Sequence, residues 1–231
     1  MLIRPHPILW VLLAFAWTCR AQTNWPSFRG SFATGISPGK APPTVWDVAK
    51  SKNILWKTPI PGLGHSCPVI WGDRVFVTTA VNQQKQSPLK VGLYGDVDSA
   101  EDNEVQQWRL LCLSKRTGTV LWSQTVHEGV PKLKRHMKAS HANCTVTTDG
   151  THVVAFFGSE GLYCFDMDGK LRWQRDFGLL RTSPVIYEDK PFAEGIDLEW
   201  GFASSPVLHG NRVYLQCDVL TNSFIAALDV A

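Results

Sequence analysis

Apolar and polar positions alternate with a period close to two along much of the chain, a pattern typical of β-strands. The clearest case is residues 111–122, which read Leu-Cys-Leu-Ser-Lys-Arg-Thr-Gly-Thr-Val-Leu-Trp. Two short apolar runs flank a polar turn that ends at Gly118, where a hairpin needs a residue that tolerates positive φ. The segment therefore predicts a β-hairpin whose second strand ends on Trp122.

This hairpin pattern is repeated along the chain. It returns at residues 162–173 with one residue fewer in the turn, begins again at 225–231, and shows its second half alone at 53–56. A strand, a tight glycine-containing turn and another strand precede each copy, so the unit is four antiparallel strands. Four-stranded sheets repeated about an axis form a β-propeller, and we predict an all-β propeller fold over residues 53–231. Residues 53–60 are expected to form a lone strand before the first blade.

Tryptophan ends the hairpin pattern at Trp56, Trp122 and Trp173. On an outermost strand, an indole can lie flat against the neighbouring blade and cover the glycine of its turn, such as Gly118 or Gly169. An indole buries a large apolar area and needs one hydrogen-bond partner for its N–H. We therefore assign these residues to contacts between blades, not to substrate stacking.

The first residues read as an export signal. Arg4 precedes an apolar run at 8–17, and small residues follow up to Ala21, which predicts a signal peptide over 1–21. The apolar run is too short to span a bilayer as a stable helix, so no membrane span is expected in the mature chain. A lipid anchor at Cys19 is the alternative, and Trp17 is bulky where such a site prefers small residues. We expect a protein of the periplasm or outer surface, with an irregular wrap at residues 22–52.

Charge gives no reason to expect nucleic acid as a partner. The 23 basic and 20 acidic residues suggest a basic protein, but removal of the leader takes away Arg4 and Arg20 and leaves 21 basic residues. The balance is then close to neutral, without the excess of positive charge typical of nucleic-acid-binding domains.

The cysteines do not suggest a disulfide framework, because five remain after Cys19 and an odd number leaves at least one thiol unpaired. Cys112 and Cys164 take the same position in two copies of the repeat, and we expect the same of Cys67 and Cys144. Residues related in this way face successive sheets, where cysteine serves as a small apolar side chain. Buried free thiols are the preferred interpretation.

Several of these motifs resemble a known family. The pattern Leu-x-x-x-Thr-Gly-x-x-x-Trp at 113–122, with Ser114 in place of the usual Asp, is similar to the repeat of PQQ-like propellers, which include quinoprotein alcohol dehydrogenases and BamB-like assembly proteins. The Trp-Pro-x-Phe-Arg-Gly opening at 25–30 and the segment 64–76 resemble exported bacterial members. The resemblance covers nearly all of residues 25–231. Complete members have seven or eight blades, so it implies a partial chain with about three of them.

The resemblance fits more than one function. The first is a non-catalytic binding or assembly scaffold of the bacterial cell envelope, with a protein or another envelope component as partner and no cofactor. The alternative is the N-terminal part of a PQQ-dependent dehydrogenase, which would need PQQ with Ca²⁺, an Asp base and a pair of adjacent cysteines. No Cys-Cys pair occurs here, and no Asp matches the base. A propeller enzyme that processes sugars or polymers is a third class, for which no paired carboxylates are evident.

Candidate binding residues lie near the starts of the blades, where a propeller chain approaches the central tunnel. Convergent polar groups at such a mouth would hold a small molecule or a peptide. A metal pair of His136 and His141 is not favoured, since no third ligand is evident. The candidates are His65, His136, Lys138, Ser140, His141, Asn143, Trp200, Ser204 and Ser205.

Two charged loops complete the sequence features. The acidic insertion at residues 96–104 offers oxygen ligands for Ca²⁺ but lacks the glycine and the terminal Glu spacing of an EF-hand. The basic run at residues 132–138 would suit an anionic partner. We expect both segments to be solvated connecting loops.

Overall fold

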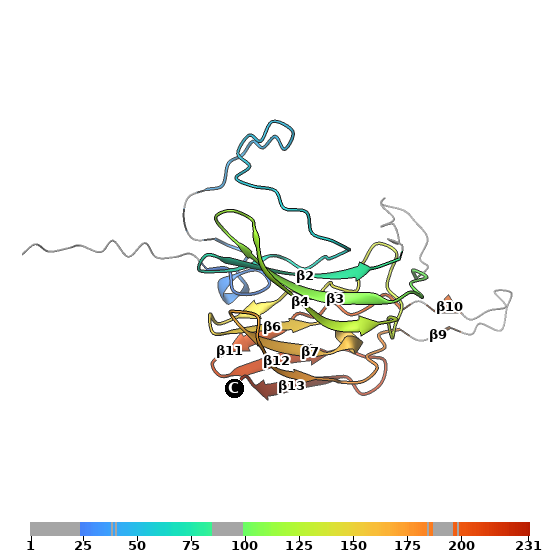
Figure 1. The fold of residues 1–231 in the computed structure, drawn as a ribbon. Helices are drawn as coiled ribbons and strands as arrows, with labels where there is room; N and C mark the ends of the chain where they lie inside the picture. Colours follow the sequence, from blue (N-terminus) through green and yellow to red (C-terminus); the bar gives the residue numbers. More distant parts are fainter. Residues whose placement is uncertain are drawn as a thin grey trace, which may run out of the picture.

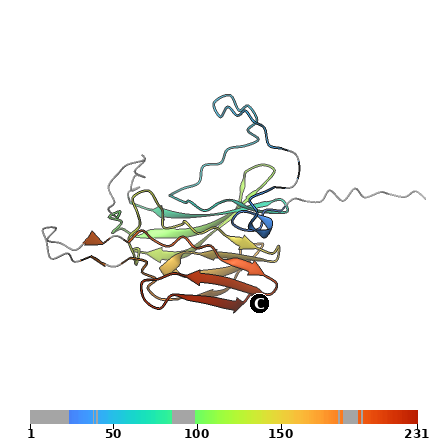
Figure 2. The same ribbon diagram turned by 180° about the vertical axis from the view of Figure 1, so that it is seen from behind.

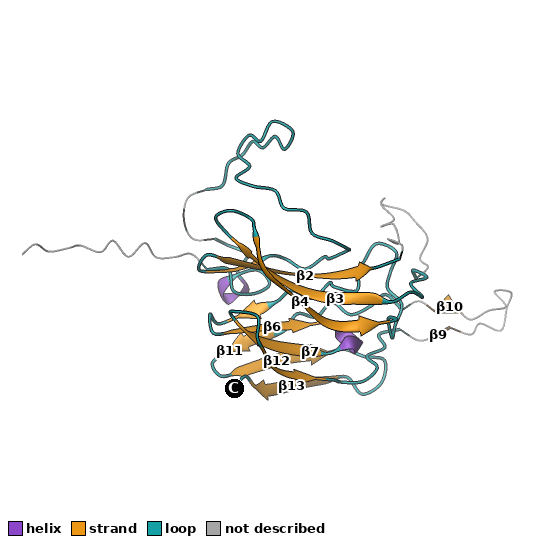
Figure 3. Cartoon of the chain, viewed as in Figure 1, coloured by secondary structure: helices purple, strands orange, loops and turns teal. Residues whose placement is uncertain are grey.

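The computed structural model describes residues 24–37, 39, 41–84, 99–183, 185–186, 196–197 and 199–231. The predicted signal peptide and Cys19 lie outside these residues. Strands account for nearly all of the regular structure, and the helical part of the described chain consists of two short 3₁₀ turns (Figure 3). No helix in the described part of the chain is long and apolar enough to cross a membrane.

Blade 1 is a four-stranded antiparallel sheet in the order β1-β2-β3-β4. Its strands are β1 (Val69–Trp71), β2 (Arg74–Asn82), β3 (Gln106–Ser114) and β4 (Val120–Gly129). A two-residue turn joins β1 to β2, and the residues on either side of it, Trp71 and Arg74, form the last pair of the ladder. The hairpin predicted around Gly118 joins β3 to β4, and Gly118 has the positive φ that the turn requires, 74°.

Blade 2 repeats this arrangement with shorter strands. Its order is β5-β6-β7-β8, formed by β5 (Thr147–Thr148), β6 (His152–Phe156), β7 (Leu162–Asp166) and β8 (Leu171–Arg175). A 3₁₀ turn at Gly158–Glu160 connects β6 to β7.

Blade 3 has three strands in the described residues: β11 (Val207–His209), β12 (Arg212–Cys217) and β13 (Phe224–Asp229). A separate two-stranded ladder, β9 (Val185–Ile186) with β10 (Ile196–Asp197), branches from the connection that precedes it. The three blades lie face to face, as both ribbon views show (Figures 1 and 2). The prediction of an all-β propeller with four-stranded antiparallel blades is confirmed.

Blade 2 is apolar on both faces because both are covered. Along β6, Val153 and Ala155 pack towards blade 1, against Phe76 and Trp108. The alternate residues Val154 and Phe156 face the other way, into a cluster that contains Val213, Leu215 and Cys217 of blade 3. The period of two thus places alternate residues in two separate cores.

Indoles bridge successive blades at the outer edge. Trp122 of β4 lies against Gly169 of blade 2 and donates its Nε1–H to the Met167 carbonyl at 3.0 Å. Trp56 stands in the same relation to Gly118 and donates to Lys115 O at 2.8 Å. Trp173 donates to the carbonyl of Val230 in blade 3 at 2.9 Å, so the contact recurs at each step.

A second indole contact lies at the opposite edge and was not predicted from the sequence. Trp71, at the end of β1, covers Gly150 in the β5–β6 turn, where an added Cβ would lie 2.3 Å from the indole Cε2. Glycine is required here on two grounds, since its φ is 89° and a side chain would displace the ring.

The prediction of a strand at residues 53–60 is wrong. This segment is irregular, because no described strand lies beside it to form a ladder. Side chains hold it instead: Trp56 docks on blade 1, and Thr58 donates its hydroxyl to Gly118 O at 2.6 Å. A period of two indicates strand propensity, but pairing needs a neighbour.

The predicted equivalence of Cys67 and Cys144 is wrong by one residue. Val69 pairs with Phe76 and Thr147 with Val154, so the register places Cys67 level with Thr145. Cys112 and Cys164 do take equivalent positions, opposite these same partners on β2 and β6.

Candidate binding site

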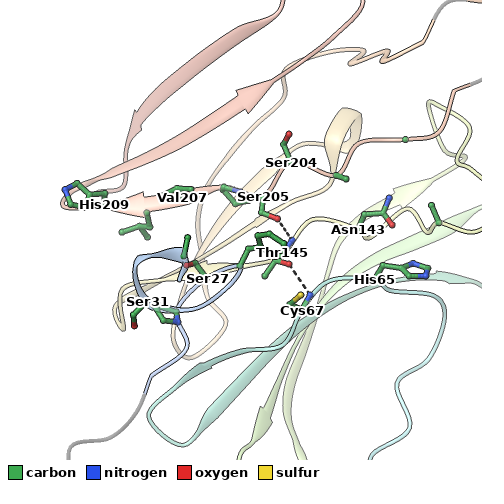
Figure 4. A pocket seen from close by; sticks show the side chains of 18 of the residues that line it. Ser27, Ser31, His65, Cys67, Asn143, Thr145, Ser204, Ser205, Val207 and His209 are labelled. Carbon is green, nitrogen blue, oxygen red and sulfur yellow. Dashed lines mark hydrogen bonds between the residues drawn. The ribbon is translucent and has the colours of Figure 1, made fainter. Parts of the chain in front are cut away.

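A cavity of about 1180 Å³ lies where the three blades begin (Figure 4). Its walls come from the segments before β1, β5 and β11, from β11 itself, and from the N-terminal turn. These segments are far apart in the sequence and meet because each blade starts at the same edge of its sheet. Its lining includes the apolar and aromatic residues Phe28, Phe32, Trp200, Val207 and Leu208.

Most of the predicted candidates line this cavity, and two do not. Ser140 and His141 are packed behind the wall, where Ser140 donates its hydroxyl to Asn143 Oδ1 at 3.1 Å. His141 Nε2 lies 3.1 Å from Asp102 Oδ2. The candidates that line the cavity are His65, His136, Lys138, Asn143, Trp200, Ser204 and Ser205.

A chain of hydrogen bonds links the innermost residues of the blades. The Cys67 N–H donates to Thr145 Oγ1 at 3.0 Å, and the Thr145 N–H donates to Ser205 Oγ at 2.9 Å (Figure 4). Blades 2 and 3 thus each supply a hydroxyl that satisfies a backbone N–H of the preceding blade. The geometry explains why Thr and Ser occupy these positions, since an apolar residue would leave a buried N–H unsatisfied.

The N-terminal segment forms one wall, which the sequence did not reveal. Trp25 pairs with Ile70 of β1 through two backbone bonds of 2.7 and 2.8 Å. The Pro26 carbonyl accepts the Thr148 N–H of β5 at 2.9 Å, so the segment joins blades 1 and 2. The chain then turns back at Gly30, whose φ is 74° and whose Cβ position is filled by the Trp25 ring. The Trp-Pro-x-Phe-Arg-Gly motif is thereby explained as a strand-like insertion followed by a tight turn.

The rim of the cavity exposes aromatic side chains. Phe32 lies in the 3₁₀ turn Ser31–Ala33 with a φ of 57° and is 97% exposed. Phe28 and Trp200 are also exposed. A large side chain held in the left-handed region is strained, and such strain concentrates at functional sites.

His136 and Trp200 form a compact unit on the opposite side. Their rings meet edge to face with centroids 5.2 Å apart, and the His136 N–H donates to the Trp200 carbonyl at 3.2 Å. The Lys138 N–H donates to His136 Nδ1 at 3.0 Å, which fixes the imidazole ring. A local hydrogen bond thus positions the His136 ring, and the Trp200 ring packs against it.

A buried ion pair supports this wall, and the expectation of two solvated loops is wrong for the two residues that form it. Asp102 of the acidic insertion and Arg135 of the basic run form a 2.6 Å contact between Oδ2 and Nε, and each side chain is 2% exposed. Arg135 also donates to the Ala139 carbonyl at 2.8 Å. The two loops neutralise each other because burial of either charge alone would be costly. Asp96 and Asp98 lie outside the described residues.

Another buried carboxylate fixes the segment that carries Trp200. Glu199 is fully buried and accepts hydrogen bonds from the Thr182 N–H, the Thr182 hydroxyl and the Gly201 N–H, at 2.6 to 3.2 Å. Its backbone carbonyl accepts the Ser99 hydroxyl at 2.7 Å. The insertion of blade 1 therefore reaches the chain that leads into blade 3.

A comparison of the sequence with family models identifies the family of this chain. A family model described as outer membrane protein assembly factor BamB, of the PQQ-like group, matches residues 39–215. The chain belongs to this BamB family. The crystal structure of BamB from Moraxella catarrhalis is similar, with 14% identity and a TM-score of 0.40, over 76% of this chain and 36% of that one. The chain thus spans little more than a third of that solved protein. No curated protein sequence matches the chain.

Four of the five described thiols of this BamB-family chain are buried in its cores, and the fifth, Cys67, lines the cavity. All five described cysteines are free, and burial raises the pKa of Cys112 and Cys164 to about 12 and that of Cys217 to about 11. Burial also raises the pKa of Cys144, which packs near Cys217. Thiols in this state are poor nucleophiles and poor metal ligands. Among the described residues, no cluster of three or more His, Cys, Asp or Glu side chains could hold a metal ion.

Proposed function

We propose that this BamB-family protein is an exported, non-catalytic binding scaffold of the bacterial cell envelope. Its partner is a protein, held at the cavity where the blades begin. The observation that carries the proposal is the cavity itself: three blades and the N-terminal segment converge on it, and its rim exposes aromatic side chains on a fixed framework.

The composition of the rim supports a protein partner. Aromatic side chains are enriched at the centres of protein interfaces because they bury much area and lose little rotamer entropy. Phe28, Phe32 and Trp200 have this character, and all three are exposed. The description of the family as an assembly factor points in the same direction.

The polar side chains in and behind the cavity wall support a binding role, because they hold the wall in place. Asp102 and Glu199 are buried and engaged in bonds that fix loops. The side chain of Asn143 is likewise occupied, accepting from the Ser140 N–H and hydroxyl at 3.0 and 3.1 Å. These groups position the wall of the site, which is the role a scaffold requires.

The test compares partner capture by matched surface variants. Purified protein is immobilised, exposed to a solubilised envelope fraction, and the retained proteins are identified by mass spectrometry. Phe32→Asp changes a rim side chain that is 97% exposed, while Ile225→Asp changes one that is 72% exposed on β13, outside the cavity. We expect the same retained protein with wild type and Ile225→Asp, and its loss with Phe32→Asp.

Two results would refute the proposal. One is an identical set of retained proteins for wild type and Phe32→Asp. The other is reduction of a dye by the protein supplied with PQQ, Ca²⁺ and a simple alcohol, which would establish the dehydrogenase alternative.

A further inference from the structure

The first strands of the three blades share one register. Val69, Thr147 and Val207 each pair with the residue seven positions later, across equivalent tight turns. The next residue along each strand is therefore equivalent as well, and these residues are Ile70, Thr148 and Leu208. In a hairpin of this kind, such a residue points its N–H and C=O away from its partner strand, towards the open edge.

The chain itself occupies this open edge in two of the three blades. Ile70 exchanges two backbone hydrogen bonds with Trp25, and the Thr148 N–H donates to the Pro26 carbonyl. A single extended segment thus adds to β1 and touches β5. Leu208 has no corresponding partner among the residues that the structure describes.

The open edge of β11 borders the cavity. Leu208 and its neighbours Pro206, Val207 and His209 all line it, and so does the N-terminal turn with Phe32. Figure 4 labels Val207 and His209 of this edge and Ser31 of the turn. Val207 is 55% exposed. An edge strand with free main-chain groups beside an apolar wall is the arrangement that binds an extended peptide by strand addition.

We propose that the cavity binds an extended polypeptide segment, which pairs with the inner edge of β11 through the main chain of Leu208. This inference rests on the proposed function, and it specifies that the protein partner binds through an extended segment of its chain. Main-chain bonds to Leu208 supply affinity, and alternate side chains of the segment reach the rim formed by Phe32 and Trp200. The cavity, about 1180 Å³, exceeds the size usual for small-molecule sites and leaves room for a segment of several residues.

The first part of the test removes the donor at the edge. Leu208→Pro deletes an N–H that points to the open edge and makes no hydrogen bond to β12, a position where proline is compatible with an edge strand. Leu208→Ala keeps the N–H and is the matched control for loss of the side chain. Circular dichroism and urea unfolding verify that both variants fold.

The probe is a panel of fluorescein-labelled peptides in which Thr alternates with Val, Phe or Tyr. Each peptide has about ten residues, which is the length of a long β-strand. Binding is measured by fluorescence anisotropy. We expect Leu208→Pro to weaken binding about tenfold, because it removes a donor and leaves a peptide carbonyl unpaired. Leu208→Ala and Ile225→Asp should bind within about twofold of wild type. N-methylation of the backbone amides along one edge of the peptide, the edge that would pair with β11, should weaken binding as much as Leu208→Pro does.

Three outcomes would overturn strand addition: no peptide of the panel binds, Leu208→Pro binds as wild type does, or N-methylation has no effect. The proposed function is separate from these outcomes. If Phe32→Asp still loses the envelope protein while Leu208→Pro keeps it, the scaffold stands and the partner enters in another form. If Phe32→Asp retains it, the scaffold proposal fails first.

Discussion

Gly169 and Trp122 offer a direct measure of the contact between blades 1 and 2. A Cβ added at Gly169 would lie 2.8 Å from Trp122 Cδ2, well inside the 3.4 Å at which ordinary contact begins, and the φ of Gly169 is 83°. Gly169→Ala therefore has two costs: about 1 kcal/mol for a side chain in the left-handed region, and about 1–3 kcal/mol for displacement of the indole.

A matched glycine separates these two costs. Gly178 has a φ of 74°, and an added Cβ would meet nothing within 4 Å. We expect Gly178→Ala to cost only the conformational part, about 1 kcal/mol. Trp122→Ala should cost about 3 kcal/mol, since the ring is half-buried and its Nε1–H bond to Met167 O is lost.

The assay is urea unfolding of wild type, Gly169→Ala, Trp122→Ala and the double variant, followed by circular dichroism. Once the indole is absent, Gly169→Ala should cost no more than Gly178→Ala. The cycle should then give an interaction free energy of about 1–3 kcal/mol. Additive costs, or equal effects of Gly169→Ala and Gly178→Ala in the wild-type background, would show that the indole does not depend on this glycine.

Further predictions concern the buried polar groups and thiols. Arg135→Met should lower the free energy of unfolding by about 3–5 kcal/mol because it removes the guanidinium that neutralises the buried Asp102 carboxylate, and restoration by the double variant Asp102→Leu/Arg135→Met in urea melts is the check. Thr145→Val should cost about 1–3 kcal/mol because the Cys67 N–H loses its acceptor, whereas Thr145→Ser should be nearly neutral in the same melts. Since burial raises the folded-state pKa of Cys112 and Cys164 to about 12 from 9.0, their contribution to stability is complete below pH 9 and is lost as the pH rises towards 12. At about pH 8, a thiol reagent should label Cys67 in the folded protein and the four buried thiols of the described residues only in urea; rapid labelling of Cys112 under native conditions would contradict its burial.

Local pattern predicted the sheets well because their strands follow one another in the chain. The hairpin at Gly118 and the equivalence of Cys112 with Cys164 depend only on a period of two and a turn residue. The strand expected at 53–60 failed because strand formation depends on a neighbour that a local pattern does not contain. The one-residue error at Cys67 has a related origin, since register is set by the turn that follows and not by residue type.

The sequence predicted where the candidate site lies, but not which contacts hold its walls together. Placing polar residues near the blade starts found His65, Asn143 and Ser205 at the cavity. Asp102 and Arg135 are 33 residues apart in the sequence. The sequence of a charged loop is the same whether the loop faces water or a loop of opposite charge, so the pairing could not be predicted. The N-terminal wall was missed for the same reason, because the partner of Trp25 is Ile70, far along the chain.

The hydrogen bond between Ser99 and the Glu199 carbonyl has a consequence for how the blades come apart. In most repeat proteins each unit touches only its neighbours, so the array can open one unit at a time from either end. Here a loop that belongs to blade 1 is tied to the chain that enters blade 3, past blade 2. Release of blade 3 therefore breaks a contact with blade 1 as well as with blade 2, and the amide protons beside Ser99 and Glu199 should exchange together.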